Sequence, residues 1–390
     1  MKVGIVTHYY HSMNYGGNLQ SYALPNAIIK NFGIQAEQIC YQTKLSDKKN
    51  KNSITIMRAI RHPRAILRSG FRHLKKTELI NHFYAKKFKR RNDSIRSFNE
   101  LIIPHSREVF NEETINSCET EYDILITGSD QVWSGMSEVY TLSFSSTARK
   151  LSYSASISRD VISDKHKAFL ERKLKDFYAI SVRNNIDKEI IKTITAKPVT
   201  VTMDPVFLLT SEEWSEVANE RLCLNEKYIF CYFLGDSKDV KRTARLFAEK
   251  HNYELVYIPN FKDNENGFVR NDLILGKHGL YDVSPSEFLG LIKNAEYVFT
   301  DSFHCLAMAI IFRKEFFAFD RISKWGQMNS RIICLLDEFH CSARYLGIMN
   351  YKLLLKAIES KDSLDYQKML DGFEERRIMS LQFLRAGLKG

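Results

Sequence analysis

The chain has 390 residues, of which 44% are hydrophobic and 26% charged, and its formal net charge is +11. This composition is typical of a globular protein, and the length favours two domains over a single core. The absence of an apolar run of about 18 residues excludes a membrane-spanning helix. The N-terminus leads directly into a strand pattern without a signal peptide, so we expect a cytoplasmic protein.

The first helix-like and strand-like segments alternate. Residues 3–10 and 35–42 are predicted strands, on either side of a helix that ends at Gly33. The segment 122–135 is predicted to be a strand followed by a polar loop. Further strand-like runs occupy 150–158, 178–185 and 198–209. The order predicts a parallel α/β layer.

The positive charge is concentrated in an insertion within this layer. Between Lys44 and Arg96 there are 17 Lys and Arg against 3 Asp and Glu, a net of +14, which leaves −3 for the rest of the chain. Apolar residues recur among the arginines at roughly helical spacing. We predict a basic helical insertion at about 44–100, which is either solvated or in contact with an anionic surface. No nucleic acid is expected, because no recognised motif accompanies the charge.

A second α/β set begins near residue 227. Strands are predicted at 227–235, 253–259, 295–299 and 315–320, with helices at 237–252 and 284–295. The C-terminal segment 371–387 is predicted to be helical. We therefore expect an N-terminal domain over 1–222, a C-terminal domain over 223–360, a cleft between them, and a helix within 361–390 that packs back on the first domain.

Four polar loops follow predicted strands, at 8–18, 128–135, 204–206 and 301–304. Ligands of open parallel sheets bind beyond the carboxyl ends of the strands, so these loops are candidates for a site in the cleft. Any α/β protein has loops of this kind, and the pattern alone therefore does not identify a ligand.

The loop at 301–304 has the clearest chemistry. Asp301 or Ser302 is a plausible N-cap, and His304 then lies in the first helical turn, where free N–H groups and the helix dipole favour an anion such as phosphate. The alternative is a capped helix with a structural histidine. Arg183 ends a strand-like run and is suited to a carboxylate or phosphate. Arg331 is a second anion candidate, although either arginine could be a surface residue.

The remaining candidates are less specific. Asp130, Asp204 and Asp263 are possible acid or base groups. Gly16 and Gly17 indicate close backbone approach to a neighbour, since their motif is not that of a dinucleotide loop. Trp133 suits the face of a sugar or a core position. The seven cysteines show no zinc spacing, so we expect reduced thiols and no metal site.

Seven motifs together resemble those of the polysaccharide pyruvyl transferase family. In chain order they are NYGGNLQSYAL, DILITGSDQVW, SYSAS, ISVR, MDPVFLL, TDSFHCLAMAIIF and MNSRI. They cover most of the chain except the basic insertion. Cys305 is a departure, because a glycine or another small residue is more usual at that position.

The resemblance implies two Rossmann-like domains facing a cleft, similar to GT-B glycosyltransferases. It also implies transfer of pyruvate from phosphoenolpyruvate to a sugar, usually as a cyclic ketal, with no cofactor. The residues expected to bind phosphoenolpyruvate are Arg183, Ser302, His304 and Arg331. The expected catalytic residues are His304, Asp204, Asp130 and Lys324, where Lys324 and Arg321 are the candidates for a lysine that does not align cleanly. The residues expected to bind the acceptor are Asn14, Tyr15, Gly16, Gly17, Gln20, Asp130 and Trp133.

The expected acceptor is a sugar of a bacterial surface polysaccharide, such as an exopolysaccharide or capsule, or of its lipid-linked oligosaccharide precursor. Residues 44–96 would then hold the enzyme at the inner face of the plasma membrane. The alternative function is that of a nucleotide-sugar-dependent glycosyltransferase of the same architecture.

Overall fold

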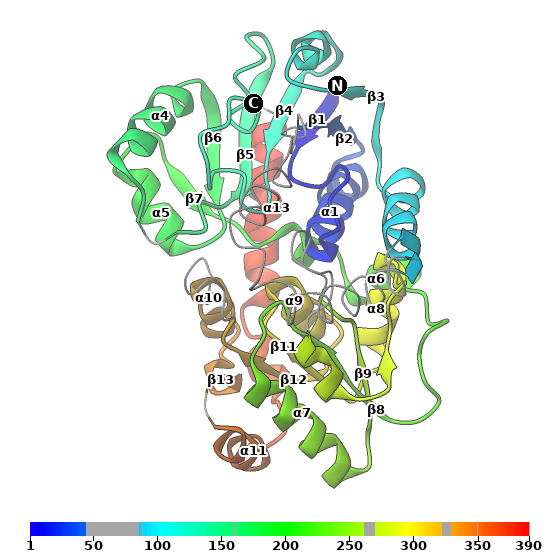
Figure 1. Cartoon of the computed structure of the whole chain (residues 1–390). Coiled ribbons are helices and arrows are strands. Elements are labelled where there is room, and N and C mark those ends of the chain that lie inside the picture. The colour runs from blue at the N-terminus through cyan, green and yellow to red at the C-terminus, as the bar shows by residue number, and fades with distance from the viewer. Residues whose placement is uncertain are drawn as a thin grey trace, which may run out of the picture.

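The computed structural model describes residues 1–43, 86–87, 89–159, 161–260, 270–321, 329–348 and 350–389 (Figure 1). Most of the predicted basic insertion, Asp263 and Lys324 lie outside the described residues. From residue 89 to 101 the chain is helical, and this helix leads into the third strand of the first sheet.

Seven of the described strands form the first sheet, in the order β3-β2-β1-β4-β5-β6-β7, and neighbouring strands are parallel. The interior strand β1 is almost wholly buried, as expected for a parallel sheet covered on both faces. The strands are β1 (Lys2–Val6), β2 (Gln35–Tyr41), β3 (His105–Phe110), β4 (Ile124–Thr127), β5 (Arg149–Ala155), β6 (Phe177–Val182) and β7 (Val199–Val201).

Six further described strands form a second parallel sheet, in the order β10-β9-β8-β11-β12-β13. Its central strand β8 is wholly buried. Figure 1 shows the two sheets one above the other. The strands are β8 (Tyr228–Tyr232), β9 (Glu254–Tyr257), β10 (His278–Gly279), β11 (Tyr297–Thr300), β12 (Glu315–Phe319) and β13 (Tyr345–Gly347).

Helices connect the strands of each sheet. Those of the first half are α1 (Tyr15–Phe32), α4 (Asp164–Leu174) and α5 (Asn185–Lys192), and α6 (Ser211–Val217) lies in the connection between the sheets. Those of the second half are α7 (Lys238–His251), α8 (Pro285–Lys293), α9 (Phe303–Ile311), α10 (Ser330–Glu338), α11 (Tyr351–Glu359), α12 (Tyr366–Met369) and α13 (Phe373–Lys389). Short 3₁₀ turns are η1 (Ile115–Glu121), η2 (Pro205–Leu208), η3 (Arg270–Leu275) and η4 (Ser342–Arg344).

Each sheet has one point where the strand order reverses. In the first sheet the chain proceeds from β1 outward to β3 and then returns to β4 on the other side of β1. In the second sheet the reversal lies between β8 and β11. The crevice at such a point, beyond the carboxyl ends of the strands, is where open α/β sheets bind ligands.

The two halves share one apolar core that includes side chains from α1, η2, α8 and α9. At the start of α1, the Tyr15 ring stacks on Phe288 of α8 at 4.7 Å, and its hydroxyl donates to the Val283 carbonyl at 2.7 Å. The helix α13 runs beside the first sheet (Figure 1). The Ser380 hydroxyl on this helix accepts from the Met203 N–H, and Arg149 donates to the Gly387 carbonyl.

Two predicted strands are shorter than expected. The first ends at Val6, because a turn with a hydrogen bond from the Tyr9 N–H to the Thr7 carbonyl follows it. The run 198–209 contains a strand only over Val199–Val201. Pro205 has no N–H to donate to a sheet, and it begins the 3₁₀ turn η2 instead.

Candidate active site

Three charged side chains of the first sheet converge beyond its carboxyl edge. Asp130 follows β4, Arg183 follows β6 and Asp204 follows β7. Arg183 Nη2 lies 3.1 Å from Asp204 Oδ2, and Arg183 Nη1 lies 3.8 Å from Asp130 Oδ1. The Ser129 hydroxyl accepts from Arg183 Nη2 at 2.6 Å and donates to Asp204 at 3.3 Å. The arginine is therefore held by groups from two separate loops.

His304 reaches this cluster from the second sheet. It lies in the first turn of α9, as predicted, and its Nε2 is 3.5 Å from Asp204 Oδ2. The other side of the ring faces α1, where a Cβ added to Gly16 would lie only 2.1 Å from His304 Nδ1. Glycine at position 16 therefore gives the imidazole the room to approach the first domain. The adjacent Phe303 ring lies 5.1 Å from the Arg183 guanidinium.

Arg331, in the first turn of α10, approaches from the second domain as well. Its Nη1 lies 3.7 Å from Asp130 Oδ1. When the Gln131 amide is oriented to satisfy both groups, its oxygen accepts from the two terminal nitrogens of Arg331 at 2.9 and 3.0 Å. Burial lowers the pKa of Arg331 to about 10, so the guanidinium remains charged at neutral pH. Asp130 is thereby shared between Arg183 and Arg331.

The two aspartates of the first domain are ionised at neutral pH. Burial raises the pKa of Asp204, but Arg183 and His304 outweigh it and hold the pKa well below its ordinary value. Burial likewise raises the pKa of Asp130, and the cations around it, led by Arg183, bring the pKa below the ordinary value. Both carboxylates are therefore suited to position and neutralise cations, and neither is suited to donate a proton.

Asp301 connects the loops that follow β8 and β11, the two strands between which the strand order of the second sheet reverses. It follows β11, and its two oxygens accept from the N–H groups of Leu234 and Gly235, which follow β8, at 2.6 and 2.7 Å. Burial raises the pKa of Asp301 to about 6. The sequence leaves Asp301 and Ser302 as the two candidates for the N-cap of α9. Ser302 occupies that position in the structure, without a capping hydrogen bond from its side chain.

A cavity of about 60 Å³ lies where these groups meet. Its lining comes from both halves of the chain and includes Asn14, Asp130, Asp301, Ser302, His304, Arg321 and Arg331. Beside it, among the described residues, His304 Nε2 and the Nε and Nη1 atoms of Arg183 are buried without a hydrogen bond, and two of these atoms, His304 Nε2 and Arg183 Nη1, have only the contacts of 3.5 and 3.8 Å to Asp204 and Asp130. Unpaired buried donors are costly and rare in folded proteins. Here they indicate a place for an acceptor group, and an anion supplies the strongest acceptors.

The family comparison agrees with this geometry. The model of the polysaccharide pyruvyl transferase family matches residues 14–323, which include all the groups above except Arg331. The chain belongs to the polysaccharide pyruvyl transferase family. Comparison with curated proteins returned no match.

Solved structures of sugar-nucleotide enzymes share the fold of this family member. UDP-GlcNAc 2-epimerase from Methanocaldococcus jannaschii is 14% identical with a TM-score of 0.54, over 98% of this chain and 99% of the other. The enzyme from Rickettsia bellii is 11% identical with a TM-score of 0.56, over 100% and 96% of the two chains. The likeness and the two parallel sheets confirm two Rossmann-like domains in the GT-B arrangement. The exact domain boundaries stay a prediction.

Of the residues predicted to bind the acceptor, some line the cavity and others support the loops around it. Asn14 caps α1 by accepting from the Gly16 N–H, and it lines the cavity. The Gly17 backbone packs against the His8 carbonyl. Gln20 is buried and bonded to Thr7 and Ser129, so it supports the loops rather than facing the cavity.

Two aromatic residues of that set lie in the core. Tyr15 is 1% exposed and holds α1 against α8 as described above. Trp133 is fully buried, its Nε1 donates to the Tyr140 carbonyl at 3.1 Å, and its ring packs edge-on to Phe177. The sequence left two interpretations of Trp133 open, contact with a sugar or a core position. The structure places it in the core, where its indole has no free face for a sugar.

Among the described residues no group of His, Cys, Asp and Glu is placed to hold a metal ion. In the same part of the chain, no helix is both long and apolar enough to cross a membrane.

Proposed function

We propose that this protein transfers pyruvate from phosphoenolpyruvate to a sugar of a bacterial surface polysaccharide or its lipid-linked precursor. The observation that carries the proposal is the set of buried nitrogen atoms on Arg183 and His304 that lack a hydrogen bond, have only long contacts to Asp130 and Asp204, and lie beside a helix N-terminus. Phosphoenolpyruvate has a phosphate and a carboxylate, so it requires two groups of cationic or N–H donors. Family membership supports the pyruvyl transfer itself.

We assign the donor phosphate to the start of α9, where His304 and Ser302 lie, and the donor carboxylate to Arg183 and Arg331. In the structure these cations are paired with Asp130 and Asp204. The phosphate and carboxylate of a bound donor would replace some of the contacts that these side chains make with Asp130 and Asp204. The two aspartates would then offset the remaining positive charge of the arginines. Their proposed contribution to catalysis is this electrostatic positioning.

The reaction requires an acid, and we assign that role to His304. Protonation of the methylene carbon makes C2 of the donor electrophilic, and a hydroxyl of the sugar attacks it. A second hydroxyl then displaces phosphate and closes the cyclic ketal. Lys324 remains a proposed catalytic residue on the sequence alone. The same holds for the contact of residues 44–96 with the inner membrane surface and for a lipid-linked acceptor.

Acceptor-dependent phosphate release tests the function. The protein is incubated with phosphoenolpyruvate and a panel of galactose- and hexosamine-containing acceptors, and the pyruvylated product is identified by mass spectrometry. No release across the panel contradicts the proposal. Protection against thermal unfolding by a nucleotide sugar, but not by phosphoenolpyruvate, would support the glycosyltransferase alternative.

Substitution of the two donor ligands tests the site. We expect His304→Ala and Arg183→Ala each to reduce turnover by at least about 100-fold, because each removes a hydrogen-bond donor proposed to contact the reacting anion. Arg245→Ala on the exposed face of α7 is the control and leaves turnover unchanged. Rates near that of the wild type in both site variants would contradict the assignment.

A further inference from the structure

His8 occupies the point where the first sheet reverses its strand order. It is the second residue after β1, and Asp130 follows the neighbouring strand β4. The two residues therefore flank the crevice in which open α/β sheets bind ligands. His304 and Asp301 hold the corresponding place in the second sheet. The proposed donor site accounts for the second crevice but leaves the first one without a ligand.

The imidazole of His8 is held in place by its surroundings. The ring lies 4.0 Å from the Tyr140 ring, measured between centroids, with the two planes tilted by 54°. The backbone of the same loop packs on α1, since a Cβ on Gly17 would lie 2.9 Å from the His8 carbonyl oxygen. The residue is half-buried, in contrast to its buried neighbours Thr7 and Tyr9.

The charge around His8 suits a base. Burial lowers the pKa of His8, while the Asp130 carboxylate and a backbone hydrogen bond with Gln131 act in the opposite direction. The imidazole is therefore neutral at neutral pH and able to accept a proton. Asp130 is ionised there, and burial keeps the Tyr140 hydroxyl protonated by raising its pKa. The carboxylate stabilises the imidazolium that forms when His8 accepts a proton.

We propose that His8 is the base that takes the proton from the attacking hydroxyl of the sugar acceptor, with Asp130 stabilising the imidazolium. The O–H bond of the acceptor breaks and its proton passes to a ring nitrogen of His8. The hydroxyl oxygen forms the new bond to C2 of the donor, while the electrons of the carbon–carbon double bond take a proton from the acid to make the methyl group. In the second half the oxygen of the second hydroxyl forms its bond to C2, and the phosphate leaves with the electrons of the C–O bond that breaks. The proton of that hydroxyl passes to the acid, which gave up its own proton in the first half, so no oxidant or reductant is needed.

This inference rests on the proposed function and names the acceptor side of the same cleft. Asp130 and Gln131 connect the two sides, because both interact with His8 and both line the cavity that contains His304. His8 therefore lies on the first-domain side of the residues assigned to the donor. An acceptor bound at the reversal of the first sheet would present its hydroxyl between His8 and the donor.

The test compares His8→Gln and His8→Ala with the wild type in the phosphate-release assay, and also measures protection by phosphoenolpyruvate against thermal unfolding. We expect His8→Gln to lower kcat by about 100- to 10,000-fold, the usual contribution of a general base, with donor protection unchanged.

The wild-type kcat should fall as the pH decreases through the pKa of His8, because the protonated ring cannot accept a proton. That dependence should be absent from His8→Gln, and added imidazole should restore part of the activity of His8→Ala.

His11→Asn is the matched control, because His11 lies in the same loop, stacks on Tyr10 and has a left-handed backbone that asparagine tolerates. It should retain the wild-type rate. The proposal is overturned if His8→Gln turns over within about threefold of wild type, keeps the wild-type pH dependence, or loses donor protection together with activity. If the wild type releases no phosphate with any acceptor, the proposed function is wrong, and the role of His8 falls with it. If the wild type is active and His8→Gln is equally active, only the role of His8 is wrong.

Discussion

At the scale of single residues, the site depends on how closely the two domains approach one another. Gly16 shows this best, because its missing side chain is the space that the His304 ring occupies. The sequence predicted correctly that Gly16 and Gly17 mark a close approach. It did not identify the neighbours, since His304 is far away in the chain and only the packing of α1 against α9 brings them together.

Substitution of Gly16 by alanine tests this contact. Alanine favours a helix over glycine by about 1 kcal/mol, so a position without steric conflict would gain stability. We expect Gly16→Ala instead to lower the free energy of unfolding by about 1–3 kcal/mol, because a Cβ would overlap His304. Urea denaturation measures the change. Gly135→Ala is the control, since no atom lies within 4 Å of the Cβ it would add, and an equal effect of both substitutions would contradict the contact.

Asp204 makes stability depend on pH. Its side chain is fully buried against Arg183 and His304, and breaking such a pair costs about 3–5 kcal/mol, so Asp204→Asn should lower the free energy of unfolding at pH 7 by that amount. The pKa of Asp204 is lowered in the folded state. Its contribution is therefore complete above the ordinary aspartate pKa of 3.8 and is lost as the pH falls below it.

The measurement is the difference in unfolding free energy between wild type and Asp204→Asn at several pH values from 7 down to 3. We expect the difference to shrink only at the acid end. Asp371→Asn, at an exposed position, should change stability by at most about 0.5 kcal/mol. A difference that grows towards acid pH would mean that the pKa of Asp204 is raised rather than lowered.

The sequence does not show the roles of all the residues of the site. Ser129 and Asp301 lie in loops that the sequence marks as candidates, and Asp301 was predicted only as a possible helix cap, but their bonds to Arg183 and to the N–H groups of Leu234 and Gly235 were not predicted. The reverse also occurs, since Trp133 has a suggestive polar neighbourhood in the sequence and yet lies in the core. Hydrogen-bond partners across domains decide these cases, and a single sequence does not contain them.

At the scale of secondary-structure elements, the sequence was most informative where burial is complete. The strand β8 and the helix α9 are wholly buried, and their apolar runs predicted them well. The edge strands β10 and β13 were not predicted, because each has only two or three residues and little hydrophobic pattern. Elements that form only when a neighbouring strand is already in place cannot be recognised from their own residues.

The helix α13 illustrates how a distant element supports the site. Leu384 is fully buried on its inner face, whereas Met379 is 54% exposed. We expect Leu384→Ala to lower the unfolding free energy by about 2–5 kcal/mol through loss of apolar contact and the cavity it leaves. Met379→Ala on the same helix should change it by at most about 0.5 kcal/mol. Chemical denaturation of the two variants makes the comparison, and equal effects would show that α13 does not pack as described.

At the scale of the whole molecule, the cleft is nearly closed. The cavity at His304 has a volume of about 60 Å³, whereas small-molecule pockets usually measure about 300–1,000 Å³. If phosphoenolpyruvate and a sugar are the substrates, as proposed above, they do not fit there together, and the two sheets would have to separate for both to enter. The contacts of His304 with Asp204 and of Arg331 with Asp130 join the two domains, and the proposed anionic donor would compete for them.

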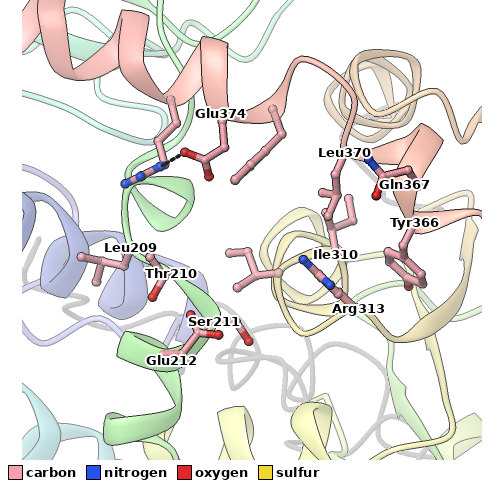
Figure 2. Close-up of a pocket in the computed structure, with 13 residues that line it drawn as sticks. Leu209, Thr210, Ser211, Glu212, Ile310, Arg313, Tyr366, Gln367, Leu370 and Glu374 are labelled. Carbon is pink, nitrogen blue, oxygen red and sulfur yellow. Dashed lines mark hydrogen bonds and ion pairs between the residues drawn. The ribbon is translucent and has the colours of Figure 1, made fainter.

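A larger cavity, of about 530 Å³, lies at the opposite end of α9 (Figure 2). Its walls are the connection Leu209–Glu212, the end of α9 with Ile310 and Arg313, and the segment from Tyr366 to Arg377 that leads into α13. The chain passes between the two domains at these segments. The helix α9 therefore carries His304 at one end and lines this cavity at the other.

Hydrogen exchange tests the closure of the cleft around the donor. We expect phosphoenolpyruvate to slow amide exchange in residues 14–18 and 302–306 together, because these segments come from different sheets and are protected jointly only when the domains close on a shared ligand. The helix α4, on the outer side of the first domain, serves as the internal control and should exchange at unchanged rates (Figure 1). Protection confined to 302–306 would place the donor on the second domain alone. The ion pairs between His304, Arg331 and the first domain would then stabilise the fold without taking part in binding.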